Sequence, residues 1–199
     1  MTDQSVMLVL RVVHIVFGLF WAGTAVVLAA FVIPAARANG PAGGRLLQEL
    51  MHRRRLSSWL ATAAALTILS GAAMYWRIAT DMHDAWIRSR PGMVLGFGGL
   101  MALIAAVLGG GVAAPTAKRL EALGRAAQAA APMPEPTLAY AAPDALTLSL
   151  VELPPASAGP PPEIVAERDR LQARLERVAR AIAVLLVIAA TCMAIARYL

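Results

Sequence analysis

The sequence predicts an all-α polytopic membrane protein, a four-helix bundle whose third and fourth spans extend into a cytoplasmic helical hairpin. Of the 199 residues, 59% are hydrophobic and only 15% are charged, and the mean hydropathy is +0.64. A soluble domain is typically about 45–50% apolar and about 25% charged, so the composition excludes a soluble globular domain and a disordered chain. Four apolar segments approach or exceed the roughly 20 residues that cross a hydrocarbon core. They predict a single transmembrane domain over residues 1–199.

The four spans are separated by charged or proline-rich segments. We expect them at residues 6–36, 56–76, 93–114 and 179–196. Spans two and three are rich in Ala and Gly, which let helix backbones approach closely in lipid. A kink is expected near 109–115, where three glycines precede Pro115, because proline removes a backbone hydrogen bond and clashes with the preceding turn.

The segments between spans one and two and between spans three and four also indicate local structure. Residues 37–55 place Leu46, Leu47, Leu50 and Met51 on one helical face, which predicts an amphipathic interfacial segment. Residues 131–162 contain nine prolines and are expected to form an irregular connector.

A long helix is expected to begin at Pro162, since proline suits the first turn of a helix. Leu171, Leu175, Val178 and Ile182 follow the 4-3-4 spacing of a coiled-coil seam. The simplest partner for this seam is the extension of span three. The two extensions together form the predicted cytoplasmic hairpin.

Basic residues predict the orientation. Thirteen of the 18 Lys and Arg residues lie between spans one and two or between spans three and four. Such loops stay in the cytoplasm, so both termini are expected on the outer side of a bacterial cytoplasmic (inner) membrane. The net charge of +6 is thereby explained by topology. The predicted partner is the lipid bilayer, and no nucleic-acid partner is expected.

One stripe in span one could carry chemistry. Met7, Arg11, His14, Gly18 and Trp21 recur at helical spacing on one face, and ionisable groups inside a span point to function. His14 is a candidate haem or metal ligand, with Arg11 available to a propionate and Trp21 beside the cofactor. Gly18 would leave room for a flat macrocycle. Snorkelling of Arg11 and simple packing of His14 remain alternatives.

Methionines gather at or above the expected depth of His14. Thioether and imidazole together favour Cu(I) or a haem axial pair, while methionine is also a common core filler. The candidate metal ligands are His14, Met74, Met101, Met193 and His83. The cofactor, haem b or copper, is left open.

Span one resembles the first helix of CopD-like membrane proteins, a superfamily that includes copper-resistance protein D and HemJ-like haem-associated proteins. The likeness lies in the run 13–23 and in residues 32–35, where His14, Trp21, Gly23 and Pro34 match the pattern. The resemblance implies a four-helix membrane fold and a ligand role for His14. Span two lacks the second His or Lys that a HemJ-type haem site would need.

The function that we expect is a non-catalytic accessory or structural subunit of a membrane complex, which contacts other subunits through small-residue helix faces and the cytoplasmic hairpin. The alternative is a copper- or haem-b-binding membrane protein with His14 as ligand in the outer half of the bundle. No nucleophile–base pair, phosphate-binding loop or dinucleotide fingerprint occurs in the sequence, which argues against an enzyme without deciding the question.

Overall fold

A computed structural model describes residues 3–82, 84–129 and 162–199, and every regular element in these ranges is helical. His83 and most of the predicted connector at 131–162 lie outside the described residues. The elements are α1 (Asp3–Val27), η1 (Leu28–Val32), α2 (Ile33–Ala38), α3 (Gly40–Gln48), η2 (Glu49–Arg53), α4 (Leu56–Asp81), α5 (Asp84–Ile87), α6 (Arg90–Leu108), η3 (Gly109–Ala113), α7 (Ala114–Ala129), α8 (Pro162–Ile195) and η4 (Ala196–Tyr198).

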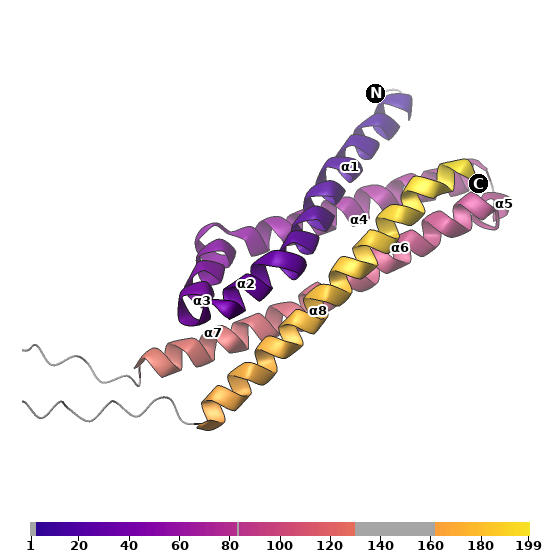
Figure 1. Ribbon diagram of the computed structural model, residues 1–199. Coiled ribbons are helices and arrows are strands. Elements are labelled where there is room, and N and C mark those ends of the chain that lie inside the picture. Colours follow the sequence, from indigo (N-terminus) through magenta and orange to yellow (C-terminus); the bar gives the residue numbers. More distant parts are fainter. Residues whose placement is uncertain (1–2, 83, 130–161) are drawn as a thin grey trace, which may run out of the picture.

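Within the described ranges, four helical stretches are long and apolar enough to cross a membrane (Figure 1). They comprise Asp3–Ala38, Leu56–Asp81, Arg90–Ala126 and Pro162–Tyr198, with 36, 26, 37 and 37 residues. Only 11–22% of the most apolar window of each stretch is buried inside the protein. The outer faces therefore present apolar side chains, as expected for helices in contact with a lipid bilayer.

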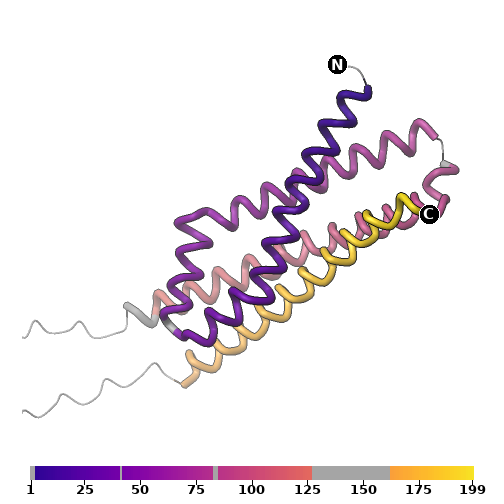
Figure 2. The backbone as a smooth tube through the Cα atoms, turned by 45° about the horizontal axis from the view of Figure 1, so that its top comes forward, coloured from indigo at the N-terminus to yellow at the C-terminus, as the bar shows by residue number. Residues whose placement is uncertain are grey.

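The helices associate mainly as two antiparallel pairs. α1 crosses α4, while α8 runs beside α6 and continues along α7 (Figures 1 and 2). Contacts of α1 with α8 and of α4 with α6 join the pairs. The two chain termini lie toward one end of the molecule. α3, the C-terminal end of α7 and the N-terminal end of α8 lie toward the other end (Figure 1).

The buried core is made of one aromatic ring surrounded by small and aliphatic side chains from the four long helices. Trp21 of α1, with 6% of its surface exposed, is its largest member. The others are Ala63, Ala102, Ala105, Ile182, Leu186 and Ala189. Alanines on α4, α6 and α8 allow the helix backbones to approach closely around the indole, which is the packing expected in lipid.

Two of the long stretches widen into a π-helical turn just before a proline. The N–H of Ile33 donates to Leu28 O and the N–H of Ala114 donates to Gly109 O, one residue further back than in an α-helix. Pro34 and Pro115 follow directly. Since proline lacks an N–H and its ring crowds the preceding turn, the wide turn accommodates it without ending the helix. The π-helical turn η3 lies where a kink near Pro115 was predicted.

Behind the first of these turns, α2 and α3 form a tight elbow that contacts the second helix pair. A Cβ at Gly43 would overlap the carbonyl of Ala36, so the elbow depends on glycine. Arg37 of α2 donates to both carboxylate oxygens of Glu176 on α8 at 3.1 Å. His52 lies 3.2 Å from Glu121 of α7. Gln48 of α3 also donates to Glu121 at 3.3 Å, so these contacts join the elbow and η2 to α7 and α8.

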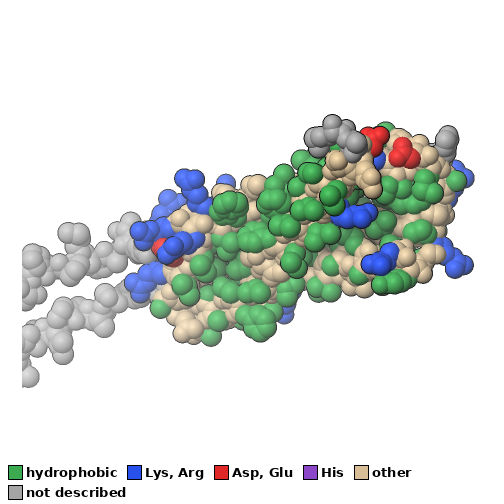
Figure 3. Space-filling view, turned by 90° about the horizontal axis from the view of Figure 1, so that it is seen from above, with side chains coloured by type: hydrophobic (Ala, Val, Ile, Leu, Met, Phe, Trp, Pro, Cys, Tyr) green, Lys and Arg blue, Asp and Glu red, His purple; other side chains and the backbone are tan. Residues whose placement is uncertain are grey.

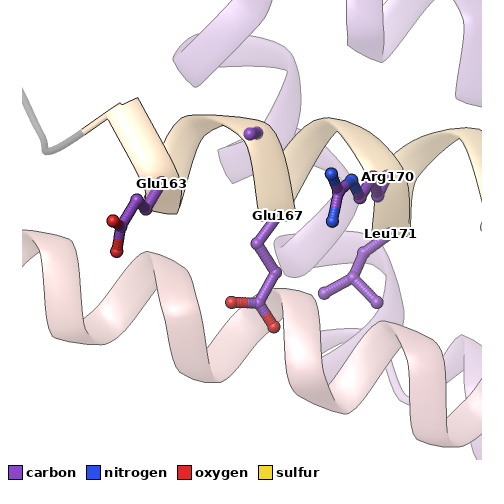
Figure 4. A pocket seen from close by; sticks show the side chains of 5 residues that line it. Glu163, Glu167, Arg170 and Leu171 are labelled. Carbon is purple, nitrogen blue, oxygen red and sulfur yellow. The ribbon is translucent and has the colours of Figure 1, made fainter.

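The helix that carries the predicted coiled-coil seam, α8, is in contact with α7. α8 begins at Pro162, as predicted, and the seam residues Leu171, Leu175 and Val178 are half-buried where α7 and α8 are in contact. Beyond them, Glu163 and Glu167 point toward α7 and line an open hollow with Leu171 (Figure 4).

Candidate metal centre

His14 lies where α1 meets both α4 and α8, and its ring is half-buried. Its Nδ1 is 2.8 Å from the backbone oxygen of Thr67 on α4. Its Nε2 is 3.4 Å from the sulfur of Met193 on α8. Because the three helices come from distant parts of the chain, the side chain connects the two helix pairs.

Glycine at position 71 lets the imidazole reach the α4 backbone. A Cβ there would lie 2.7 Å from His14 Cε1 and 2.9 Å from Nδ1, which is closer than such atoms approach. The Thr67 carbonyl also accepts a bond from Ser70 Oγ at 3.2 Å. A carbonyl oxygen has two lone pairs, so the Thr67 oxygen can accept hydrogen bonds from the His14 and Ser70 side chains as well as from the helix backbone.

The bond to Thr67 determines which nitrogen of His14 carries the proton. A carbonyl oxygen can only accept, so the Nδ1–H donates to it. In the neutral imidazole, Nε2 then holds a lone pair, and this lone pair faces a second electron donor, the Met193 thioether. The arrangement suits a soft metal ion bound between the two atoms.

The two donor atoms are close enough together to hold one metal ion. Bonds from a metal to nitrogen and sulfur ligands are about 2.0 Å and about 2.3 Å long, and the N–S separation of 3.4 Å is shorter than their sum. The donation of the other ring N–H to a backbone carbonyl is the usual way in which a ligating histidine is oriented.

The same spacing does not suit a haem axial pair. Axial ligands lie on opposite sides of the iron, which requires an N–S separation of about 4.3 Å with the same bond lengths. The space expected beside Gly18 is also taken, because a Cβ there would meet Thr67 Cγ2 at 3.3 Å. Gly18 therefore serves helix packing between α1 and α4, and the structure offers no room for a macrocycle at this glycine.

The other predicted site residues are distributed differently. Trp21 belongs to the buried core, and Met101 packs against that core. Arg11 is exposed and makes no hydrogen bond or ion pair with any described residue. Met74 is half-buried on α4, about two turns beyond Thr67. His83 lies outside the described residues.

Among the described residues, Met193 is thus the only predicted ligand within hydrogen-bonding distance of His14. No group of three or more His, Cys, Asp and Glu side chains suited to a metal occurs in this part of the chain. A metal at His14 would be held by one imidazole and one thioether, a donor set selective for soft ions.

Sequence reasoning missed the role of Thr67, Ser70 and Gly71. Ser70 and Gly71 are small residues in an Ala-rich span, which is typical of helix packing. The available signal was the polar pair Thr67 and Ser70 three residues apart in an otherwise apolar segment. Such a pair places two hydroxyl groups on one helix face, here the face that meets His14.

No protein-family model matches this sequence, and neither the curated proteins nor the solved structures contain a match. The resemblance of span one to CopD-like proteins therefore remains a prediction. The assignment of a function depends on the residues and their geometry.

Proposed function

We propose that this chain is a non-catalytic integral membrane protein that binds Cu(I) between His14 and Met193. The observation that supports the proposal is the 3.4 Å approach of His14 Nε2 to Met193 Sδ, with Nδ1 engaged by Thr67. Imidazole and thioether are ligands that Cu(I) accepts. When bound, the ion would supply a soft, exchangeable metal centre inside the membrane.

Each residue has a distinct part in this proposal. His14 and Met193 provide the donor atoms. The carbonyl of Thr67 holds the imidazole in the tautomer that leaves Nε2 free, and Gly71 provides the space for the ring. The haem b alternative is less well supported because the two donor atoms are too close together for opposite axial positions.

Competition with a chromophoric Cu(I) chelator tests the proposal. The purified full-length chain in detergent should remove one equivalent of Cu(I) from bicinchoninic acid, while His14→Ala should lose at least tenfold in affinity. Thermal unfolding of both proteins in the absence of metal checks that His14→Ala is folded. Equal copper retention by wild type and His14→Ala, or a Soret band on the purified wild type, would contradict Cu(I) binding at this site.

A second candidate is an accessory or structural subunit of a membrane complex. α7 and the first part of α8 extend past the α2–α3 elbow (Figure 1), and the hollow formed with Glu163 and Glu167 lies on this extension (Figure 4). These features favour contact with a partner protein. Native mass spectrometry after mild extraction should then give a mass well above 20.9 kDa, and Glu163→Arg with Glu167→Arg should release the chain.

We also infer that both termini face the outer side of a bacterial cytoplasmic membrane, with α3, α7 and the start of α8 in the cytoplasm as a helical hairpin and its adjoining elbow. Two observations support this orientation. The termini lie toward the same end (Figure 1), and the Lys- and Arg-rich segments lie toward the other, as cytoplasmic segments do. Labelling of an added cysteine after Leu199 by an impermeant maleimide in intact cells would test it. Protection of that cysteine together with labelling of one at Gly124 would contradict it.

A further inference from the structure

Three arginines, Arg53, Arg54 and Arg55, lie at the junction between η2 and α4, and Arg45 lies about two helical turns before them on α3. We call these four residues the arginine corner. We propose that the arginine corner binds the phosphate headgroups of anionic phospholipids in the surrounding bilayer. The proposal follows from the depth of the corner along α4, its uncompensated charge and the apolar surface beside it.

Two tryptophans fix the depth of the arginine corner. Trp59 and Trp76 lie near opposite ends of α4 and are 58% and 71% exposed. Their separation in sequence corresponds to about 26 Å along a helix, close to the roughly 30 Å of a hydrocarbon core. Exposed tryptophans concentrate at the two membrane–water interfaces. Arg55, one turn before Trp59, therefore lies at the level of the lipid headgroups.

The arginine corner carries more positive charge than its own carboxylate neutralises. Glu49 is the only acidic residue between positions 37 and 55. It pairs with Arg53 at 3.2 Å and with Arg54 at 3.8 Å, and these two side chains remain 81% and 76% exposed. Arg45 and Arg55 have no ion-pair partner among the described residues. Exposed guanidinium groups at headgroup depth attract anionic lipids.

The start of α4 adds to this attraction. Arg55 precedes the helix in a left-handed conformation with φ of 53°, and its side chain makes no capping bond. The N–H groups of the first helical turn and the positive end of the helix dipole thus face the same corner. Phosphate oxygens are accepted by such N-termini.

Apolar side chains beside the corner favour a lipid over a soluble anion. Leu46 of α3 is 58% exposed, and Trp59 lies one turn into α4. At the left-hand end of Figure 3, several Lys and Arg side chains lie next to a largely apolar surface. A segment that combines arginines with exposed leucine and tryptophan suits the membrane interface, where acyl chains cover the apolar part.

Native mass spectrometry of the full chain, titrated with dioleoyl phosphatidylglycerol or dioleoyl phosphatidylcholine, tests the proposal. The wild type should retain phosphatidylglycerol preferentially. Arg45→Gln with Arg55→Gln should weaken this binding roughly tenfold or more, because each arginine near the surface contributes substantially to the attraction. This pair leaves the Glu49 ion pairs intact. The matched control is Arg88→Gln with Arg90→Gln, which removes two exposed, unpaired arginines near the other end of α4.

Several results would overturn the proposal. Equal retention of both lipids by the wild type would remove the preference for anionic headgroups. An equal loss in the Arg88/Arg90 control would show a general effect of net charge. Full displacement of the lipid by millimolar inorganic phosphate would identify a soluble-anion site instead. A lipid preference lost only in the Arg45/Arg55 variant would support the corner.

Discussion

The imidazole of His14 packs against the backbone of Gly71, where a Cβ would come within 2.7 Å of His14 Cε1. A single methyl group at this position is therefore enough to move the ring. Because the same ring donates to Thr67 and faces Met193, its displacement affects the contact between the two helix pairs as well as the candidate metal centre.

We expect Gly71→Ala to destabilise the protein and to weaken Cu(I) binding. Inserting a methyl group into a closely packed site typically costs about 1–3 kcal/mol of folding free energy, and here it also breaks the bond from His14 to Thr67. Thermal unfolding and chelator competition measure the two effects. Gly99→Ala is the matched control, since a Cβ at Gly99 meets nothing within 4 Å. Similar behaviour of the two variants would contradict the close approach at Gly71.

Replacing the thioether should separate metal binding from packing. We expect Met193→Leu to lower Cu(I) affinity at least tenfold while changing stability by less than about 1.5 kcal/mol, because the two side chains have similar volumes. Met101→Leu makes the same change against the buried core and should leave copper binding unaltered. If both variants bind Cu(I) like the wild type, Met193 is not a ligand.

The long helices were predictable because their signal is local. Hydropathy alone locates the four spans, and Pro162 marks the start of α8. The proline at 115 predicted a kink, but it did not predict that the helix would widen into the π-helical turn Gly109–Ala113 before it.

The pairing of His14 with Met193 was not predictable, since these residues are 179 positions apart. Each span carries apolar residues on all of its faces. Hydropathy therefore does not determine how a membrane helix is rotated about its axis. Several methionines were therefore equally good candidates for the partner of His14. Only the packing of α1 against α4 and α8 distinguishes Met193 from Met74 and Met101.

The ion pair between Arg37 and Glu176 should stabilise the elbow against α8. Glu176 keeps only 14% of its side chain exposed and also lies 3.6 Å from Arg180, whereas Arg37 is 48% exposed. Because exposure of the arginine screens the attraction, we expect Glu176→Gln to cost about 1 kcal/mol, with a smaller loss at high salt.

A double-mutant cycle with Arg37→Gln isolates this interaction in thermal unfolding. The two substitutions should be less than additive, because each removes the same pair. Glu49→Gln is the control, since Glu49 pairs only within its own segment and its loss should not couple to position 37. Strict additivity of the Arg37 and Glu176 substitutions would show that the pair does not hold the elbow to α8.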